Sequence, residues 1–308
     1  MNASVAFAAL LVSIALALPG ASLAQNEGGR QFGPWVWGIQ GGAIHQFDTD
    51  LSDGPGSFSL NRYFIQPSVA YAWDRRNTLS LAVGFGEADY EFSADATING
   101  QQPWNRIREA RVSLPIRFSP SARTDAIVIP IVRSYAEQGA NLDDGRTQGV
   151  LAGIGWRLSD TLFIGPGFGW YSELGDGSSA FPILVIDWSI SDRLTLTTGR
   201  GLGASQGPGL DLTYSLNENW KIGLTGRYEE IRFALDTDAS SPRTYGEDRS
   251  LPLLLSVRYS PWPMTMIGAF LGADFGGKLS ILDTNGQRLS VSEYDVAPSV
   301  GLVFRSRF

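Results

Sequence analysis

The chain ends in YDVAPSVGLVFRSRF, residues 294–308, and this stretch decides the fold. Every second residue is apolar over most of it: Val296, Pro298, Val300, Leu302, Phe304 and Phe308, with Ser306 as the exception. The residues between them are mostly small or charged, including Ala297, Ser299, Arg305 and Arg307. Because successive side chains of a strand point to opposite faces, the stretch predicts a β-strand with one apolar face. A strand of a water-soluble sheet has the same pattern.

The last residues are more specific than the alternation. Gly301, Leu302, Phe304 and the C-terminal Phe308 resemble the terminal signature by which Gram-negative outer-membrane β-barrels are recognised for assembly. The resemblance implies an outer-membrane barrel that the barrel assembly machinery inserts. A secreted, water-soluble β-protein is the alternative.

The N-terminus predicts export. Residues 5–18 are mostly apolar, and Ser22-Leu23-Ala24 has the small-x-small pattern of a signal peptidase site. We therefore expect a signal peptide at residues 1–24, cleaved near Ala24, and one barrel domain at residues 25–308. Residues 1–4 contain no Lys or Arg, which leaves open a start upstream of Met1. A membrane anchor is less favoured, because the apolar run is shorter than the ~18 residues that span a bilayer.

Composition narrows the class further. No other segment is a continuous apolar span, so a membrane location requires a closed barrel, in which every backbone group pairs between strands. The chain has no Cys, which excludes a lipidated cysteine, disulfides and thiolate chemistry. Its net charge of -7 argues against a nucleic-acid partner.

The connections between alternating segments are short and long in turn. Short, turn-like connections occur at residues 74–77, 119–125, 159–160, 191–193, 217–219 and 260–263. Longer, polar connections occur at residues 48–61, 93–103, 138–147, 173–179, 205–208, 236–248 and 283–292. We therefore predict an all-β fold, a closed antiparallel transmembrane barrel of about 14 strands (12–16), with short periplasmic turns and longer extracellular loops. Trp and Tyr flank the short turns, where an aromatic girdle is expected.

Two faces can be assigned along most segments. The apolar face is predicted to contact lipid: Trp35, Trp37, Ile39, Phe47, Tyr63, Ile65, Val69, Tyr71, Trp73, Val112, Leu114, Ile116, Phe118, Val150, Ile154, Trp156, Leu210, Leu212, Tyr214, Leu251, Leu253, Leu255, Val257 and Tyr259. The opposite face carries the candidates for the lumen and its constriction: Glu109, Arg111, Arg117, Arg157, Asp187, Lys221, Arg227, Glu229, Arg258 and Arg305. Arg or Lys facing lipid at the midplane would cost about 2–4 kcal/mol, so this face should be wet.

The lumen candidates support two interpretations. Their basic excess favours an electropositive constriction that passes anions or acidic solutes. Alternatively, Arg–Glu and Arg–Asp pairs fill the interior and close it.

Some segments cannot be divided into an apolar and a polar face. Residues 126–132 and 264–275 are apolar on both faces, and the apolar face switches near residues 87–90 and 229–231. Such switches indicate β-bulges or strands that rise above the bilayer.

His45 is the only histidine and hence the only imidazole base available to an outer-leaflet lipid enzyme. It shares the face of Trp35, Trp37 and Phe47, which favours an interfacial side chain over catalysis.

Residues 48–54 contain several carboxylates close together, but they lack the ligand spacing and the closing Glu of a calcium loop. We therefore predict no catalytic residue, no metal and no cofactor.

The last third resembles a bacterial family of outer-membrane β-barrels of unknown function. The residues that carry the resemblance are PGLDLTY (208–214), RYEEIRF (227–233), GEDR (246–249), LDTNG (282–286) and YDVAP (294–298). The resemblance implies fold and compartment, with outer-membrane lipid and lipopolysaccharide as surroundings. We expect a porin-like passive channel for small polar or anionic solutes. A closed surface-interaction barrel and a lipid enzyme using His45 are the alternatives, and the oligomeric state stays open.

Overall fold

The computed structural model describes residues 34–308 except 75, 99, 176, 199–208 and 238–241. The predicted signal peptide and its cleavage site at Ala24 lie outside the described residues. Among those described, no helix is long and apolar enough to cross a membrane.

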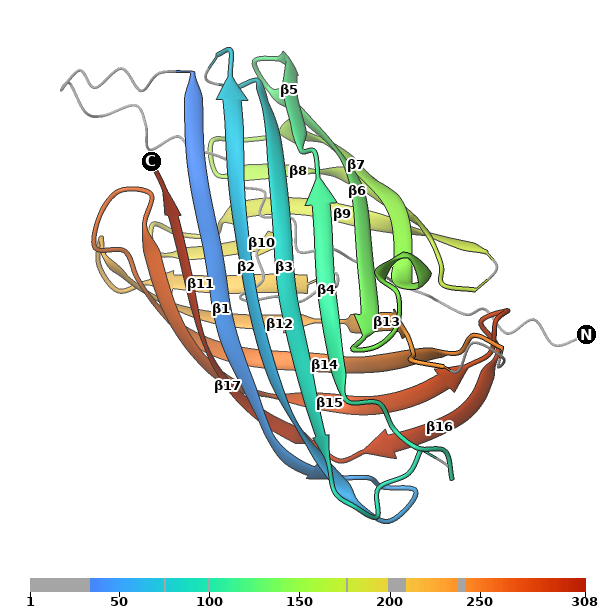
Figure 1. The fold of residues 1–308 in the computed structure, drawn as a ribbon. Helices are drawn as coiled ribbons and strands as arrows, with labels where there is room; N and C mark the ends of the chain where they lie inside the picture. The colour runs from blue at the N-terminus through green and yellow to red at the C-terminus, as the bar shows by residue number, and fades with distance from the viewer. Residues whose placement is uncertain (1–33, 75, 99, 176, 199–208, 238–241) are drawn as a thin grey trace, which may run out of the picture.

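The described chain is mostly β-strand (Figure 1). The strands are β1 (Trp35–Asp50), β2 (Ser57–Ala72), β3 (Thr78–Phe92), β4 (Arg106–Ser113), β5 (Ile116–Ser121), β6 (Thr124–Glu137), β7 (Arg146–Arg157), β8 (Leu162–Ser172), β9 (Ser178–Ser189), β10 (Leu194–Thr198), β11 (Gly209–Ser215), β12 (Trp220–Arg227), β13 (Glu229–Ala234), β14 (Tyr245–Tyr259), β15 (Met266–Leu282), β16 (Arg288–Tyr294) and β17 (Ala297–Arg307). One 3-10 turn, η2 (Leu142–Gly145), precedes β7.

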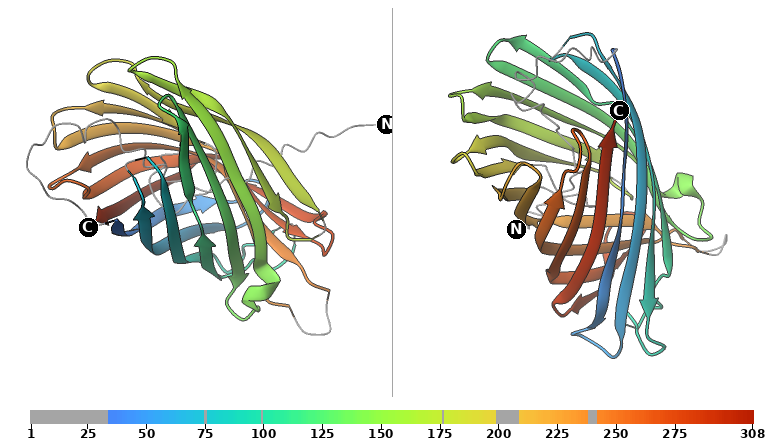
Figure 2. Two further views of the ribbon diagram at one scale, coloured as in Figure 1. Left: turned by 90° about the horizontal axis from the view of Figure 1, so that it is seen from above. Right: turned by 90° about the vertical axis from the view of Figure 1, so that its left-hand side faces the viewer.

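These strands form one closed antiparallel barrel of 14 strands. Strands β4 and β5 both pair with β3 and β6, so they form one position of the wall. Strands β12 and β13 share a second position beside β14, and β16 and β17 share a third beside β15. Pairing of β17 with β1 closes the ring, which wraps as one tilted wall (Figure 2). The predicted fold class and strand number are confirmed.

Both ends of the described chain lie at the end of the barrel that carries the short turns. The backbone N–H of Trp37 donates to the carbonyl of Phe308 over 2.8 Å, and the Phe308 N–H donates to the Trp37 carbonyl over 2.9 Å. The terminal strand therefore pairs with the first strand up to its last residue. In bacterial barrels the short-turn end faces the periplasm.

The predicted outward face is correct. None of the residues assigned to it is buried, and Trp35, Trp37 and Tyr63 expose more than half of their surface. Exposed Trp and Tyr side chains gather near the short turns: Trp35, Trp37, Tyr71, Trp73, Trp156, Trp188, Tyr214, Trp220 and Trp262. An apolar belt with an aromatic rim is the outer surface of a membrane-spanning barrel. Gly301, by contrast, faces inward, where a Cβ would lie 2.3 Å from the Phe270 ring.

Several predicted long loops are wrong in extent, because strands continue into them. β14 starts at Tyr245 and β16 at Arg288, inside the predicted loops 236–248 and 283–292. β1 likewise continues to Asp50. The sequence predicts loops there because these strand ends contain polar residues such as Asp50, Glu247 and Arg288.

At the long-loop end the polarity of the two faces is reversed. In β3 the outward Glu87 and Asp89 pair with Arg106, while the inward Tyr90 is buried. The β2–β3 register is continuous from Phe58 opposite Phe92 to Ala72 opposite Thr78. No bulge therefore causes the switch near residues 87–90, and the strands instead rise above the belt. Bulges do occur in β1, between Gln46 and Thr49, and in β14, between Arg249 and Leu251.

A second contact closes the barrel at this end. Ala136 of β6 pairs in parallel with Ala234 of β13, across the interior of the 14-strand ring. The contact encloses a packed interior that we term the mouth core. It consists of Leu51, Phe58, Leu60, Tyr90, Ala96, Ile98, Trp104, Ile107, Tyr135, Ile231, Phe233, Leu279, Ile281, Tyr294 and Ala297.

The segments that are apolar on both faces line an apolar part of the lumen. Ile129 and Ile131 of β6 face inward and pack with Leu151, Tyr171 and Phe181 of β7, β8 and β9. On the opposite wall, Phe270 of β15 packs with Leu254 and Val303. One face of each segment thus meets lipid and the other meets a buried cluster, which explains why neither face is polar.

Candidate functional site

The ten predicted lumen residues lie on the inward face, but most are held by neighbouring side chains. Arg157 and Lys221 are exposed at the short-turn end of the lumen, and Asp187 lies on the same wall, opposite Phe163. Less exposed, each with a polar partner, are Glu109, Arg111, Arg117, Arg227, Glu229, Arg258 and Arg305. Their role in a constriction remains a prediction.

The level beneath the mouth core carries an ion pair that crosses the lumen. Arg62 of β2 pairs with Glu229 of β13, although these strands are not neighbours in the wall. Glu229 also lies 3.4 Å from the guanidinium of Arg227. Sequence reasoning missed Arg62, although it shares the inward parity of Gln66 and Ser68. The pair closes part of the lumen cross-section with two compensating charges.

A second group lies beside this pair on β2, β4 and β6. Glu109 accepts a 2.9 Å hydrogen bond from the Tyr135 hydroxyl and lies 3.7 Å from Arg111. Arg111 donates to Gln66 over 2.9 Å. The guanidinium of Arg133, also missed from the sequence, lies 4.8 Å from the centre of the Tyr171 ring. Charge and aromatic surface thus lie side by side at this level.

The short-turn half of the lumen has its own compensated groups. Asp125 lies 3.7 Å from Arg117 and 2.8 Å from Arg76. Arg258 pairs with Asp211, which also accepts a hydrogen bond of 2.7 Å from Thr225. Arg305 donates to Gln40 over 3.2 Å. The acids Asp125 and Asp211 offset much of the predicted basic excess, so the field inside is weaker than the Arg count indicates.

The mouth core is completed by the β3–β4 connection, which folds inward. Trp104 is 2% exposed, and its ring lies 4.8 Å from Phe233 and 5.7 Å from Tyr90. Ile98 of the same connection is fully buried. Glu137 links the β3–β4 connection to the segment after β13, because its carboxylate accepts hydrogen bonds from the backbone N–H of Asn105 over 3.0 Å and of Asp236 over 2.9 Å. We term this connection the plug, because its buried Ile98 and Trp104 fill part of the interior at this end.

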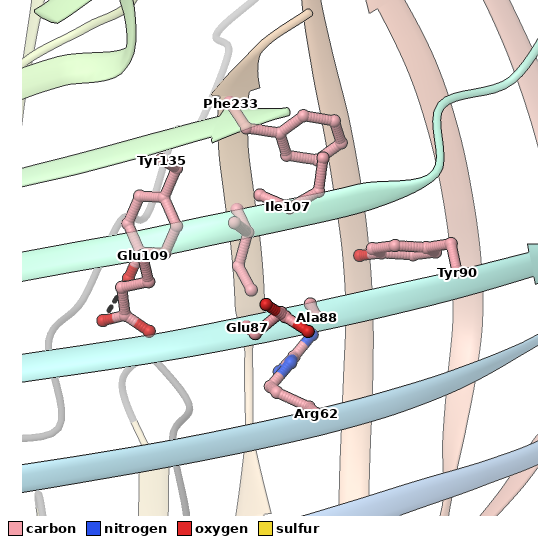
Figure 3. A pocket seen from close by; sticks show the side chains of 9 residues that line it. Arg62, Glu87, Ala88, Tyr90, Ile107, Glu109, Tyr135 and Phe233 are labelled. Carbon is pink, nitrogen blue, oxygen red and sulfur yellow. Dashed lines mark hydrogen bonds between the residues drawn. The ribbon is translucent and has the colours of Figure 1, made fainter. Parts of the chain in front are cut away.

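A small cavity of about 20 Å³ lies where the mouth core meets the ion pairs (Figure 3). Its walls are Arg62, Glu87, Ala88, Tyr90, Ile107, Glu109, Tyr135, Ile231 and Phe233. A second cavity of about 20 Å³ lies against β6 to β9, with Arg117 and Asp125 at one side and Ile127, Phe163 and Val185 around it. The interior therefore contains space next to both charged and apolar groups.

His45 faces outward, as predicted from its parity. Its Nδ1 lies 2.9 Å from Oδ1 of Asn61, and its ring meets Phe47 edge-on at 4.8 Å. Within the described part of the chain, no hydroxyl lies within hydrogen-bond distance of the imidazole, so the nucleophile of a Ser–His arrangement is not in place. No group of three or more His, Cys, Asp or Glu residues among those described is arranged to hold a metal ion.

No protein-family model matches the chain. No curated protein matches it either. Among solved structures, the COG4313 outer membrane channel from Pseudomonas putida F1 is similar, with 11% identity, a TM-score of 0.48 and coverage of 92% of this chain and 99% of that chain. A Pseudomonas aeruginosa FadL homologue has 13% identity, a TM-score of 0.43 and coverage of 89% and 88%. The translocator domain of autotransporter NalP from Neisseria meningitidis has 12% identity, a TM-score of 0.37 and coverage of 89% and 90%.

The class of the protein follows from its own geometry. A closed antiparallel barrel with an apolar outer belt, an aromatic rim at the short-turn end and a polar, partly charged lumen is an outer-membrane type β-barrel.

Proposed function

We propose that the protein is a passive outer-membrane channel for small polar solutes, closed in this structure by its mouth core. The observation that carries the proposal is the stack of inward charged groups at two levels of the lumen, from Arg157 and Lys221 up to Arg62 and Glu229. Buried charges cost free energy even when paired, so a barrel that only needed stability would do as well with an apolar interior.

The solute class follows from the balance of charge. Because Asp125, Asp211, Glu109 and Glu229 offset neighbouring arginines, the lumen favours anions only weakly. Arg157 and Lys221, exposed at the short-turn end, supply the remaining basic field. Small polar solutes are therefore the proposed cargo, with a modest anion preference.

A closed barrel that acts through its surface is the second candidate, and the packed mouth core favours it. The two functions differ in what removal of the plug does. Trp104→Ala should cost about 3–5 kcal/mol of stability as a large-to-small core change. If the protein is a channel, Trp104→Ala should also open a passage for solutes through the lumen.

Liposome swelling tests the proposal. Vesicles that contain the mature chain are diluted into isotonic glycine, arabinose or sucrose, and the rate of swelling is compared between wild type and Trp104→Ala. A Phe168→Ala variant, changed on the exposed outer face, is the control. Faster, size-dependent swelling with Trp104→Ala supports the channel. Folded Trp104→Ala barrels that swell no faster than empty vesicles contradict it.

A further inference from the structure

One row of inward side chains crosses the part of the wall formed by β17, β1, β2, β3, β4 and β6 (Figure 1). Strand register joins Arg305 of β17 directly to Gln40 of β1, and Gln40 directly to Gln66 of β2. Further along the wall, Arg111 of β4 lies opposite Arg133 of β6. We term these five residues the donor row.

Gly84 of β3 joins the two parts of the donor row. It lies opposite Arg111, and a Cβ on it would lie 3.3 Å from Nε of Arg111 and 3.5 Å from Oε1 of Gln66. Because no side chain stands between them, Arg111 donates a hydrogen bond of 2.9 Å to Gln66 across β3. The donor row is therefore continuous from β17 to β6.

The donor row also climbs through the barrel. Barrel strands are tilted, so a row that runs across them rises along the barrel axis. At one end, Arg305 lies opposite Met266, the first residue of β15 after a short turn. At the other end, Arg133 lies opposite Thr147 near the start of β7, and its guanidinium lies 5.7 Å from the centre of the Tyr135 ring. The donor row thus leads from the short-turn end to the mouth core.

The glutamines of the donor row offer N–H groups to the lumen. Oε1 of Gln40 accepts from Arg305 over 3.2 Å, and Oε1 of Gln66 accepts from Arg111. Because each amide oxygen already accepts from a guanidinium, the N–H groups are the part of each amide that a solute can use. Arg305, Gln40 and Gln66 are partly exposed, so these donors can be reached. Carboxylates accept hydrogen bonds without donating any, and they bind guanidinium groups strongly.

We propose that the donor row binds small solutes that carry a carboxylate and guides them along the lumen. Neighbouring strands are about 5 Å apart, so a carboxylate that leaves one donor meets the next. Glu109, 3.7 Å from Arg111, offsets part of the positive charge and keeps binding weak enough for release, as conduction requires. This inference rests on the proposed channel function and gives its anion preference a chemical class.

Broadening of the NMR methyl signal of acetate by the mature, detergent-folded barrel tests the proposal, with acetamide as the uncharged probe of the same shape. Gln40→Glu and Gln66→Glu each remove N–H donors and add a negative charge, while the neighbouring arginine keeps its acceptor. Gln148→Glu, on the exposed face of β7, is the matched control for the substitution. Thr195→Glu adds the same charge to the inward face of β10, across the lumen. Heat-shifted gel mobility confirms that each variant is folded.

We expect saturable binding of acetate that is weaker by about fivefold or more in Gln40→Glu and Gln66→Glu and near wild type in both controls. Acetate binding that does not saturate, or that survives both substitutions, overturns the donor row. An equal loss in Thr195→Glu also overturns it, because the general field of the lumen would then explain the binding. Equal binding of acetamide overturns the assigned class.

Conductance of Trp104→Ala barrels separates this inference from the proposed function. Conductance without acetate binding rejects the donor row alone. Acetate binding without conductance rejects the channel alone, since the donors at Arg305, Gln40 and Gln66 are partly exposed in the closed barrel as well.

Discussion

Ala136 of β6 and Ala234 of β13 form a parallel backbone bridge, although the five strands β7 to β11 lie between them in the wall on one side. All other strand pairings in the described barrel are antiparallel between neighbours of the wall. Both side chains belong to a small buried cluster with Leu174, Tyr245 and Leu282. The bridge pinches the long-loop end, so that the mouth core can fill it with aromatic side chains.

Charge substitution at the short-turn entrance should change ion selectivity. Arg157 and Lys221 are exposed there, so Arg157→Glu with Lys221→Glu reverses the local field with little effect on folding. In a plug-opened background, the reversal potential under a salt gradient should move toward cations. The same shift should be absent when Arg146, exposed at the other end of β7, is changed to Glu. An unchanged potential would show that ions do not pass this entrance.

Arg232 is expected to be important for stability. It donates to Glu247 over 2.7 Å and to Glu173 over 2.9 Å, and it lies 3.2 Å from Glu230. Glu230 and Glu247 are almost fully buried, so Arg232→Met leaves buried carboxylates short of a counter-charge. We expect a loss of about 3–5 kcal/mol in urea unfolding.

The matched control is Arg243→Met, which removes an arginine that is exposed and paired with Asp144 over 2.9 Å. Exposed pairs contribute about 0–1 kcal/mol. Similar losses for the two variants would contradict a stabilising role of Arg232 beyond that of a surface pair.

Two glycines should respond differently to an added methyl group. A Cβ on Gly165 would lie 2.0 Å from the carbonyl oxygen of Ile154 and 2.4 Å from Cα of Gly155, so Gly165→Ala must move backbone. A Cβ on Gly226 would meet nothing closer than Leu253, at 3.6 Å. Gly165→Ala should lower the yield of heat-modifiable barrel and the urea midpoint, and Gly226→Ala should leave both near wild type. Equal behaviour would show that β7 and β8 can move apart freely.

The terminal aromatic residue should matter for assembly more than for the folded state. Phe308 exposes 68% of its surface and holds β1 through its backbone. Phe308→Ala keeps these backbone hydrogen bonds, so refolding in detergent should be unchanged. Assembly in cells should fall several-fold, measured as heat-modifiable protein in the outer membrane. Leu216→Ala, exposed at a short turn, is the control. Normal assembly of Phe308→Ala would reject the proposed signature.

The wall of the barrel was predictable, because the alternation of apolar and polar side chains is visible within each strand by itself. Alternation and turn residues determine each strand, and the lipid-facing residues Trp35, Leu253 and Leu255 lie where that period predicts. The polarity reversal at Glu87 and Tyr90 appeared as an irregularity, since no local pattern distinguishes a strand above the bilayer from a bulged one.

The interior was less predictable, because its contacts join strands that are distant in sequence. Arg62 and Glu229 are 167 residues apart, and the sequence gives no reason to pair them rather than other inward charges. The bridge from Ala136 to Ala234 involves two small residues without a distinctive pattern. Asp125 was missing from the predicted lumen residues, because the sequence placed it in a short turn. In the structure it belongs to β6 and faces inward.

A reversible disulfide across the Ala136–Ala234 bridge, here called the lock, tests most directly whether the barrel is a channel that is closed at its long-loop end. The chain has no Cys, so Ala136→Cys with Ala234→Cys introduces a single possible disulfide across the pinch. Conductance is recorded in planar bilayers with the disulfide oxidised and then reduced, and Ala70→Cys with Ser80→Cys, between neighbouring β2 and β3, is the control. If opening requires β6 and β13 to separate, the oxidised lock should abolish conductance and reduction should restore it, while the control conducts in both states. Equal conductance of the locked and reduced barrel, or none in either state and in the control, would contradict the account.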